Sequence, residues 1–261
     1  VDARISIGDD GVNMIGDPHT FTALVEINDG SGWVDATVGT EVEFTTDFGT
    51  FGDLLDPAEM TKTVETVGGE ATVTLNSDTP GISEVSASVE IEVSGISLER
   101  VTDGTGLNSE PAEKTWVNAR ISIGDDGTNE VGDPHTFTAH VEINDGTGWF
   151  DAPEGTDVTF SIESGPGELD PISGVATTDS NGEATIELES GTPGITEVSA
   201  SAEIDVDGVT IDIETDGEGE NSGPAEKTWV DARISIGDDG TNMVGDPHMF
   251  TAHVEINDGT G

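Results

Sequence analysis

Hydrophobic and polar residues alternate along this chain in many short runs, and the runs are bounded by Gly, Asp, Asn or Pro. In HTFTAHVEI, one side holds the apolar side chains of Phe137, Ala139, Val141 and Ile143, and the other side is polar. A period of two is typical of a strand with one buried face, and no segment shows sustained helical spacing. Runs of about five to ten residues separated by turn signals predict an antiparallel β-sandwich of about seven strands.

Long stretches of the sequence recur. VDARISIGDDG begins at Val1 and again at Val230, and VNARISIGDDG begins at Val117, so the copies are 116 and 113 residues apart. A period of that length is the size of a whole domain and is too long for one turn of a solenoid. We therefore expect tandem domains in residues 1–110 and 111–223, followed in residues 224–261 by a joint and the first two strands of an incomplete third repeat.

The third repeat contains two predicted strands, which cannot bury a core alone. One explanation is that the remaining strands of this domain lie beyond the segment. The other is that the two strands complete a neighbouring chain by strand addition. The sequence leaves both explanations open.

Two short turns suggest a further hairpin in each repeat. VSGI (Val93 to Ile96) and VDGV (Val206 to Val209) have the length and residue types of tight two-residue hairpins. Asp-Gly suits such a turn because it tolerates positive φ.

VGDPHTFTAHVEI, GTDVTFSI and ATTDSNGEATIELESGTPGITEVSA resemble the group 1 bacterial immunoglobulin-like domain, which occurs in tandem in invasin- and intimin-type surface proteins. The resemblance covers most of residues 117–202 and, more loosely, residues 1–87. It implies immunoglobulin-like domains that act as rod-forming spacers on cell surfaces, often with binding done by a different, terminal domain. The chain departs from the pattern by its extra hairpin, SAEIDVDGVTIDIE (Ser201 to Glu214), and by its acidity.

The charge is extreme, with 55 acidic against 7 basic residues and a formal net charge of -48. Nucleic acid and anionic membranes are therefore unsuitable partners, because phosphate binding needs Lys and Arg. Screening salt or bound divalent cations must offset the repulsion, so the setting is salty or rich in calcium. There is no cysteine, and no apolar run approaches the length of a membrane span.

The motif GDDGxNxxGDPH suggests a metal site. Short Asp spacings with Gly in a loop let hard oxygens converge, as Ca²⁺ requires, although the pattern does not match an EF-hand. The alternative is an acidic turn, with Asp and Gly chosen for turn geometry. The candidate calcium ligands are Asp9, Asp10, Asp17, Asp125, Asp126, Asp133, Asp238, Asp239 and Asp246. We do not expect zinc, because the spacing of His135 and His140 puts the two rings on opposite faces of one strand.

The segment between repeats holds most of the basic residues and a tryptophan. Each Trp either plugs the space between consecutive domains or covers the edge of its own domain. The Arg residues are expected to pair with carboxylates across the joint or between neighbouring strands. A covalent link from Lys to Asn or Asp is conceivable, but only three Lys exist. The candidate joint residues are Lys114, Trp116, Arg120, Lys227, Trp229 and Arg233.

These observations predict a structural repeat segment of a long extracellular rod, filament or matrix protein, stabilised by cations and with copies of itself as partners. The first alternative is the stalk of a cell-surface adhesin whose binding domain lies elsewhere. The second is a glycan-binding accessory module, which would need clustered exposed aromatics. No nucleophile constellation appears, so an enzyme is not expected.

Overall fold

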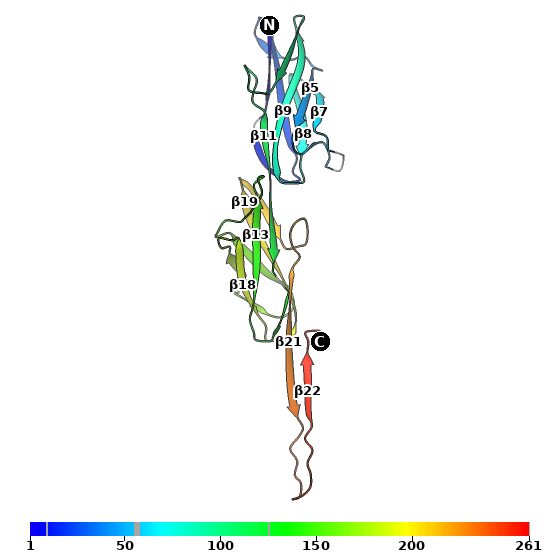
Figure 1. The fold of residues 1–261 in the computed structure, drawn as a ribbon, viewed down its shortest axis with the longest axis vertical. Coiled ribbons are helices and arrows are strands. Elements are labelled where there is room, and N and C mark those ends of the chain that lie inside the picture. Colours follow the sequence, from blue (N-terminus) through cyan, green and yellow to red (C-terminus); the bar gives the residue numbers. More distant parts are fainter. Residues whose placement is uncertain (9, 55–57, 125, 261) are drawn as a thin grey trace. The chain divides into compact units, whose positions relative to one another are not determined.

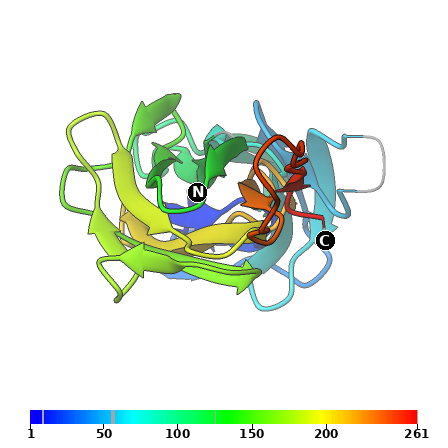
Figure 2. The same ribbon diagram turned by 90° about the horizontal axis from the view of Figure 1, so that it is seen from below.

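The computed structural model describes residues 1–8, 10–54, 58–124 and 126–260. In this part of the chain the ribbon consists of strands and loops, without a helix (Figure 1 and Figure 2). Hence none of these residues forms a helix long and apolar enough to cross a membrane. The chain divides into two compact units. The first unit is Val1–Ala119 with Ile143–Phe150 and Asp205–Ile211, and the second is Arg120–Glu142, Asp151–Ile204 and Asp212–Gly261.

The first unit has two layers of strands, which are antiparallel except for the parallel pair of β2 and β11. One follows the order β1-β3-β8-β6 with β4 beside β3, and the other follows β11-β9-β5-β7 with β10 beside β9 and β2 beside β11. The strands are β1 (Asp2–Ile7), β2 (Gly11–Met14), β3 (His19–Asn28), β4 (Trp33–Asp35), β5 (Glu41–Thr46), β6 (Thr50–Phe51), β7 (Thr61–Glu65), β8 (Glu70–Asn76), β9 (Gly81–Val93), β10 (Ile96–Val101) and β11 (Ala112–Ile123).

The second repeat follows the same plan. One layer follows β16-β18-β13 with β14 beside β13, and the other follows β12-β21-β19-β15-β17 with β20 beside β19. The strands are β12 (Gly127–Glu130), β13 (His135–Asn144), β14 (Trp149–Asp151), β15 (Asp157–Ser164), β16 (Glu168–Asp170), β17 (Val175–Thr177), β18 (Glu183–Glu189), β19 (Gly194–Val206), β20 (Val209–Glu214) and β21 (Ala225–Ile236). The last strand, β22 (Ala252–Asn257), belongs to the third repeat.

The inward-facing side chains fill the space between the two layers. In the first unit one buried cluster combines Phe21 of β3 with Phe44 of β5 and Trp116 of β11. In the second unit Phe137, Ala139 and Val141 are fully buried, as their alternation predicts. The expectation of an all-β chain built of immunoglobulin-like sandwiches is confirmed.

The predicted two-residue hairpins are present. Ser94 and Gly95 connect β9 to β10 with φ of 52° and 82°. Asp207 and Gly208 connect β19 to β20 with φ of 52° and 85°. Two successive positive φ angles define the turn that matches the twist of a hairpin, which explains the Gly at the second position.

The compact units are out of phase with the sequence repeat. Division at residue 110 assigns all of β11 to the second repeat, whereas the first unit extends to Ala119. The reason is pairing, because residues 112–116 bond to β9 and residues 114–117 bond to β2. From Arg120 onward β11 belongs to the second unit, where it neighbours β13. One strand thus ends one sandwich and begins the next.

In the third repeat, β21 and β22 form an antiparallel pair, with Asp231 opposite Asn257 (Figure 1). Its apolar side chains face solvent, including Ile234 at 72% and Val254 at 62% exposure. The corresponding Ile5 and Val25 are fully buried in the first unit. The difference follows from the missing second layer.

Candidate functional site

The most distinctive polar group of the first unit is a buried lysine. Lys114 lies on β11, directly opposite Gly11 of the parallel strand β2, and its side chain is fully buried. Its Nζ donates a hydrogen bond to Oδ1 of Asn13 at 2.6 Å. The Asn13 amide is held in turn, because its Nδ2 donates to the carbonyl oxygens of Asp17 and Pro18 at 3.2 and 3.3 Å.

The second unit repeats this arrangement residue by residue. Lys227 lies on β21 opposite Gly127 of β12, is 1% exposed and donates to Oδ1 of Asn129 at 2.7 Å. Nδ1 of His135 lies 3.2 Å from Nζ of Lys227. We call Gly11, Asn13, His19 and Lys114, with Gly127, Asn129, His135 and Lys227, the two lysine clusters.

A tryptophan covers each lysine cluster. Trp116 and Trp229 are fully buried, and their rings lie 5.6 and 5.7 Å from Nζ of the lysine two residues earlier. Each indole Nε1 donates to a side chain of its own unit, Ser83 Oγ at 2.9 Å or Thr196 Oγ1 at 3.1 Å. The structure therefore places each Trp in the core of the unit that its strand completes.

Burial has a direct electrostatic effect on these lysines. An ammonium is disfavoured where water is excluded, and burial lowers the pKa of Lys114 to about 8. Burial also lowers the pKa of Lys227. The pKa of His19 is lowered by burial and then by the nearby charge of Lys114. Among the described residues, no carboxylate lies within ion-pair distance of either buried lysine.

The three repeated arginines have a different role. Arg4, Arg120 and Arg233 each donate from Nε to a glutamate on the neighbouring strand, at 2.6, 2.7 and 2.6 Å. These are pairs between neighbouring strands, one of the two arrangements that we expected. All are at least partly solvent-exposed, so water screens the charges and each pair adds little to stability. The partners are Glu26, Glu142 and Glu255.

The candidate calcium ligands are used in several ways. Asp9 and Asp125 lie outside the described residues. Asp10 and Asp126 each accept a backbone N–H from the strand that opens the following repeat, from Glu113 of β11 and Glu226 of β21, at 2.7 Å.

The remaining candidates do not converge. The backbone N–H groups of Asp17, Asp133 and Asp246 donate within tight turns, and Asp238 and Asp239 lie in an exposed loop. Among the described residues, none of these carboxylates joins a group of three with ligand atoms within 4.8 Å of one another. The calcium prediction stays a prediction.

One group among the described residues does meet that distance, namely His140, Glu142 and Asp151. His140 and Glu142 lie on β13 two positions apart, and Asp151 lies on the adjacent β14. An imidazole with two carboxylates could hold a divalent transition metal. All three members are already engaged, because Nε2 of His140 lies 2.9 Å from Oδ1 of Asp151 and Glu142 accepts from Arg120.

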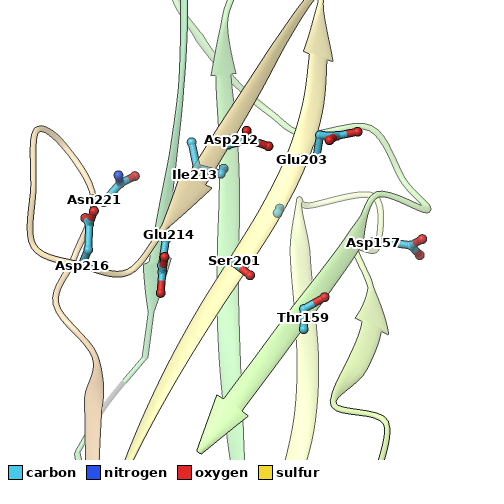
Figure 3. A pocket seen from close by; sticks show the side chains of 10 residues that line it. Asp157, Thr159, Ser201, Glu203, Asp212, Ile213, Glu214, Asp216 and Asn221 are labelled. Carbon is cyan, nitrogen blue, oxygen red and sulfur yellow. The ribbon is translucent and has the colours of Figure 1, made fainter. Parts of the chain in front are cut away.

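A shallow acidic pocket lies beside β15, β19 and β20 in the second unit (Figure 3). Its carboxylates do not point toward one place, because they are spread over three strands and the loop after β20. They belong to Asp157, Glu203, Asp212, Glu214 and Asp216. This surface is acidic without the geometry of a metal site.

The sequence indicates the lysines and tryptophans as candidate joint residues, but it does not indicate the side chains that contact the lysines. The asparagines Asn13 and Asn129 and the histidines His19 and His135 were not connected with them. A signal was available, because GxNxxGDPH recurs with each repeat. What the sequence did not reveal is that β2 lies parallel to a strand about 100 residues later.

No family model matches the chain. Over 115 residues the chain is 37% identical to Intimin of Escherichia coli O111:H-, which is 44% of this chain and 10% of that protein. This match agrees with the resemblance to intimin-type repeats. The chain spans about a tenth of the length of the curated relative it matches.

Two solved structures of intimin fragments are also similar. The D0-D1 domain of Intimin is 24% identical, with a TM-score of 0.29, over 86% of this chain and 97% of that one. The D00-D0 domain of Intimin is 15% identical, with a TM-score of 0.40, over 80% and 96%. With TM-scores below 0.5, these likenesses add no support to a functional assignment.

Proposed function

We propose that this chain is a load-bearing segment of an extracellular surface protein, made of repeated immunoglobulin-like units. The observation that carries this proposal is the parallel pairing of β2 with β11, repeated between β12 and β21. In each unit these strands are near the entry and the exit of the chain. Tension along the chain pulls two parallel neighbours in opposite directions, so their hydrogen bonds are loaded together rather than one at a time.

Two further observations support an extracellular stalk. The similarity to Intimin covers nearly half of the chain, and intimin-type proteins carry such repeats on the cell surface. The net charge of -48 keeps neighbouring segments apart and soluble. The role proposed is mechanical, with binding done by another part of the protein.

Single-molecule pulling in two directions tests the proposal. The chain has no cysteine, so pairs of introduced cysteines can serve as the only handles. Val1→Cys with Asn118→Cys loads the first unit along β2 and β11. Glu84→Cys with Glu113→Cys loads facing, exposed positions of β9 and β11 crosswise.

We expect a clearly higher rupture force for the lengthwise pair than for the crosswise pair. Both proteins have the same native contacts outside the handles, so the comparison isolates direction. Equal forces in both directions would contradict the load-bearing role.

Self-assembly into filaments is the second candidate, and it concerns the apolar side chains of β21 and β22, which are exposed. Further strands of this repeat type could cover them, supplied either by the same chain or by a second copy. Electron microscopy of the purified chain, with Ca²⁺ and then with a chelator, separates the candidates. Regular filaments would support self-assembly, and their disruption by the chelator would support stabilisation by cations. Isolated particles in both conditions would contradict self-assembly and agree with the stalk role.

A further inference from the structure

Each lysine cluster brings together the reactants for amide formation. A primary amine meets a carboxamide, because Nζ of Lys114 and Lys227 lie 2.6 and 2.7 Å from Oδ1 of Asn13 and Asn129. The carboxamide carbon is bonded to Oδ1 at about 1.2 Å, so Nζ lies less than about 4 Å from it. Both residues are fixed before any reaction, which is the condition for a high effective concentration.

We propose that an isopeptide bond joins Lys114 to Asn13 in the first unit and Lys227 to Asn129 in the second. In each reaction Nζ of the neutral lysine attacks Cγ of the asparagine, and a new C–N bond forms. The bond from Cγ to Nδ2 breaks, and a proton lost by the amine ends on that leaving nitrogen. The products are one secondary amide and one ammonia, so no oxidant or other reactant is needed.

The surroundings of the lysine favour the nucleophilic, neutral form. Both lysines are buried without a carboxylate at ion-pair distance among the described residues, although the chain carries 55 acids. The lowered pKa of Lys114, about 8, means that an appreciable fraction of its amine is neutral near pH 7. A lysine that served as a structural cation would gain from a carboxylate partner.

A histidine is placed to move the proton. Nδ1 of His135 lies 3.2 Å from Nζ of Lys227, within reach for proton transfer. His19 occupies the same position in the first repeat, and the charge of Lys114 contributes to lowering its pKa. The imidazole can take the proton from the amine and return it to the departing nitrogen.

The two glycines of the clusters keep this space open. A Cβ at Gly11 would lie 3.0 Å from Nζ of Lys114 and 3.4 Å from the ring of His19. A Cβ at Gly127 would lie 2.8 Å from Nζ of Lys227 and 3.2 Å from the ring of His135. Neither glycine has a positive φ. Their role is therefore to admit the amine and the imidazole.

The bond would fasten the strands that carry the load. Asn13 is on β2 and Lys114 on β11, and Trp116 is the residue in register with Asn13. A covalent link here closes a loop from residue 13 to residue 114, so tension cannot extend that loop. The proposal rests on local geometry and does not depend on the stalk function.

Intact mass measurement of the denatured chain tests the bond directly, because denaturation removes every hydrogen bond. We expect a mass about 34 Da below the sequence mass, which corresponds to two ammonia molecules. Digestion with a glutamate-specific protease should give branched peptides that contain Asn13 with Lys114 and Asn129 with Lys227. The branched peptides distinguish the bond from succinimide formation at a single asparagine, which also releases ammonia.

Two lysine variants complete the test. The double variant Lys114→Arg with Lys227→Arg should have the full mass calculated from its own sequence. The control variant Lys62→Arg changes an exposed lysine that pairs with Glu59, and its mass should still lie below its sequence mass by the amount lost in the wild type. The wild-type measurement stands even if the double variant does not fold. The full sequence mass, with all four residues in linear peptides after prolonged incubation, would overturn the proposal.

Discussion

The two complete repeats share the same lysine cluster but differ on the outer face of their third strand. The lysine clusters are copied without a change of residue type, from Gly11, Asn13, His19 and Lys114 to their counterparts. On the outer face of the third strand, Leu24 of the first repeat corresponds to His140 of the second. Buried apolar positions also change, because Val73 corresponds to Ile186 and Val89 to Ala202. The residues of the lysine cluster are therefore kept where the size of nearby apolar side chains is not.

The largest expected effect comes from breaking the cluster in one unit at a time. Asn13→Ala should destabilise the first unit and Asn129→Ala the second, and each variant serves as the control for the other. A cross-link that closes a loop of roughly 100 residues is worth about 4–5 kcal/mol through the unfolded state. Denaturant unfolding followed by tryptophan fluorescence should show one transition moving and the other unchanged. A shift of about 1–3 kcal/mol would point to a lost hydrogen bond of the buried amine instead.

The next effect is a change in pH dependence. With Asn13→Ala and Asn129→Ala combined, both amines are free. The folded Lys114 loses its proton near pH 8, while the unfolded lysine keeps it up to its ordinary pKa of 10.5. The unfolded state then binds more protons between these values, so the free energy of unfolding should rise with pH by up to about 3 kcal/mol.

In the wild type the same lysine nitrogens would be amides, and this rise should be absent. Comparing the two proteins cancels the repulsion among their many shared carboxylates. If the free energy of unfolding changes with pH in the same way in both proteins between pH 7 and 10.5, the lysine amines are in the same chemical state in both. That result would contradict the isopeptide bond.

The smallest effect concerns the surface difference. His140→Leu gives the second repeat the residue of the first, and Leu24→His does the reverse beside Glu26 and Asp35. Because His140 and Asp151 are both partly exposed, we expect each change in unfolding free energy to stay under about 1 kcal/mol. Thermal unfolding measures it, and a loss of several kcal/mol would show that the outer face is structurally essential.

The sequence predicted what alternation and self-comparison can reveal. The strand from His135 to Asn144 shows a clear period of two, and its inward residues are buried. The hairpins at Ser94 and Asp207 follow from local turn chemistry that needs no knowledge of the rest of the fold. These features depend on neighbours along the chain.

The lysine cluster could not be predicted in this way. Strand β2 has four residues, all half-buried, so it shows no alternation. Its parallel partner lies about 100 residues later, and parallel pairing leaves no short-range signature. Self-comparison also fixes the length of a repeat but not the point at which a domain begins. For that reason the sequence leaves open whether Trp116 lies between two domains or within one, and the structure shows it in the buried cluster of the first unit.

The shared strand β11 means that the unit of copying differs from the unit of folding. As the chain is synthesised from its N-terminus, the first sandwich lacks Lys114 and Trp116 until the opening residues of the next repeat have emerged. Those residues supply both the core tryptophan and the strand beside β2. Each unit would therefore complete its fold only after the first strand of the next repeat has been synthesised. Folding of the chain would then follow synthesis with a delay of about one repeat.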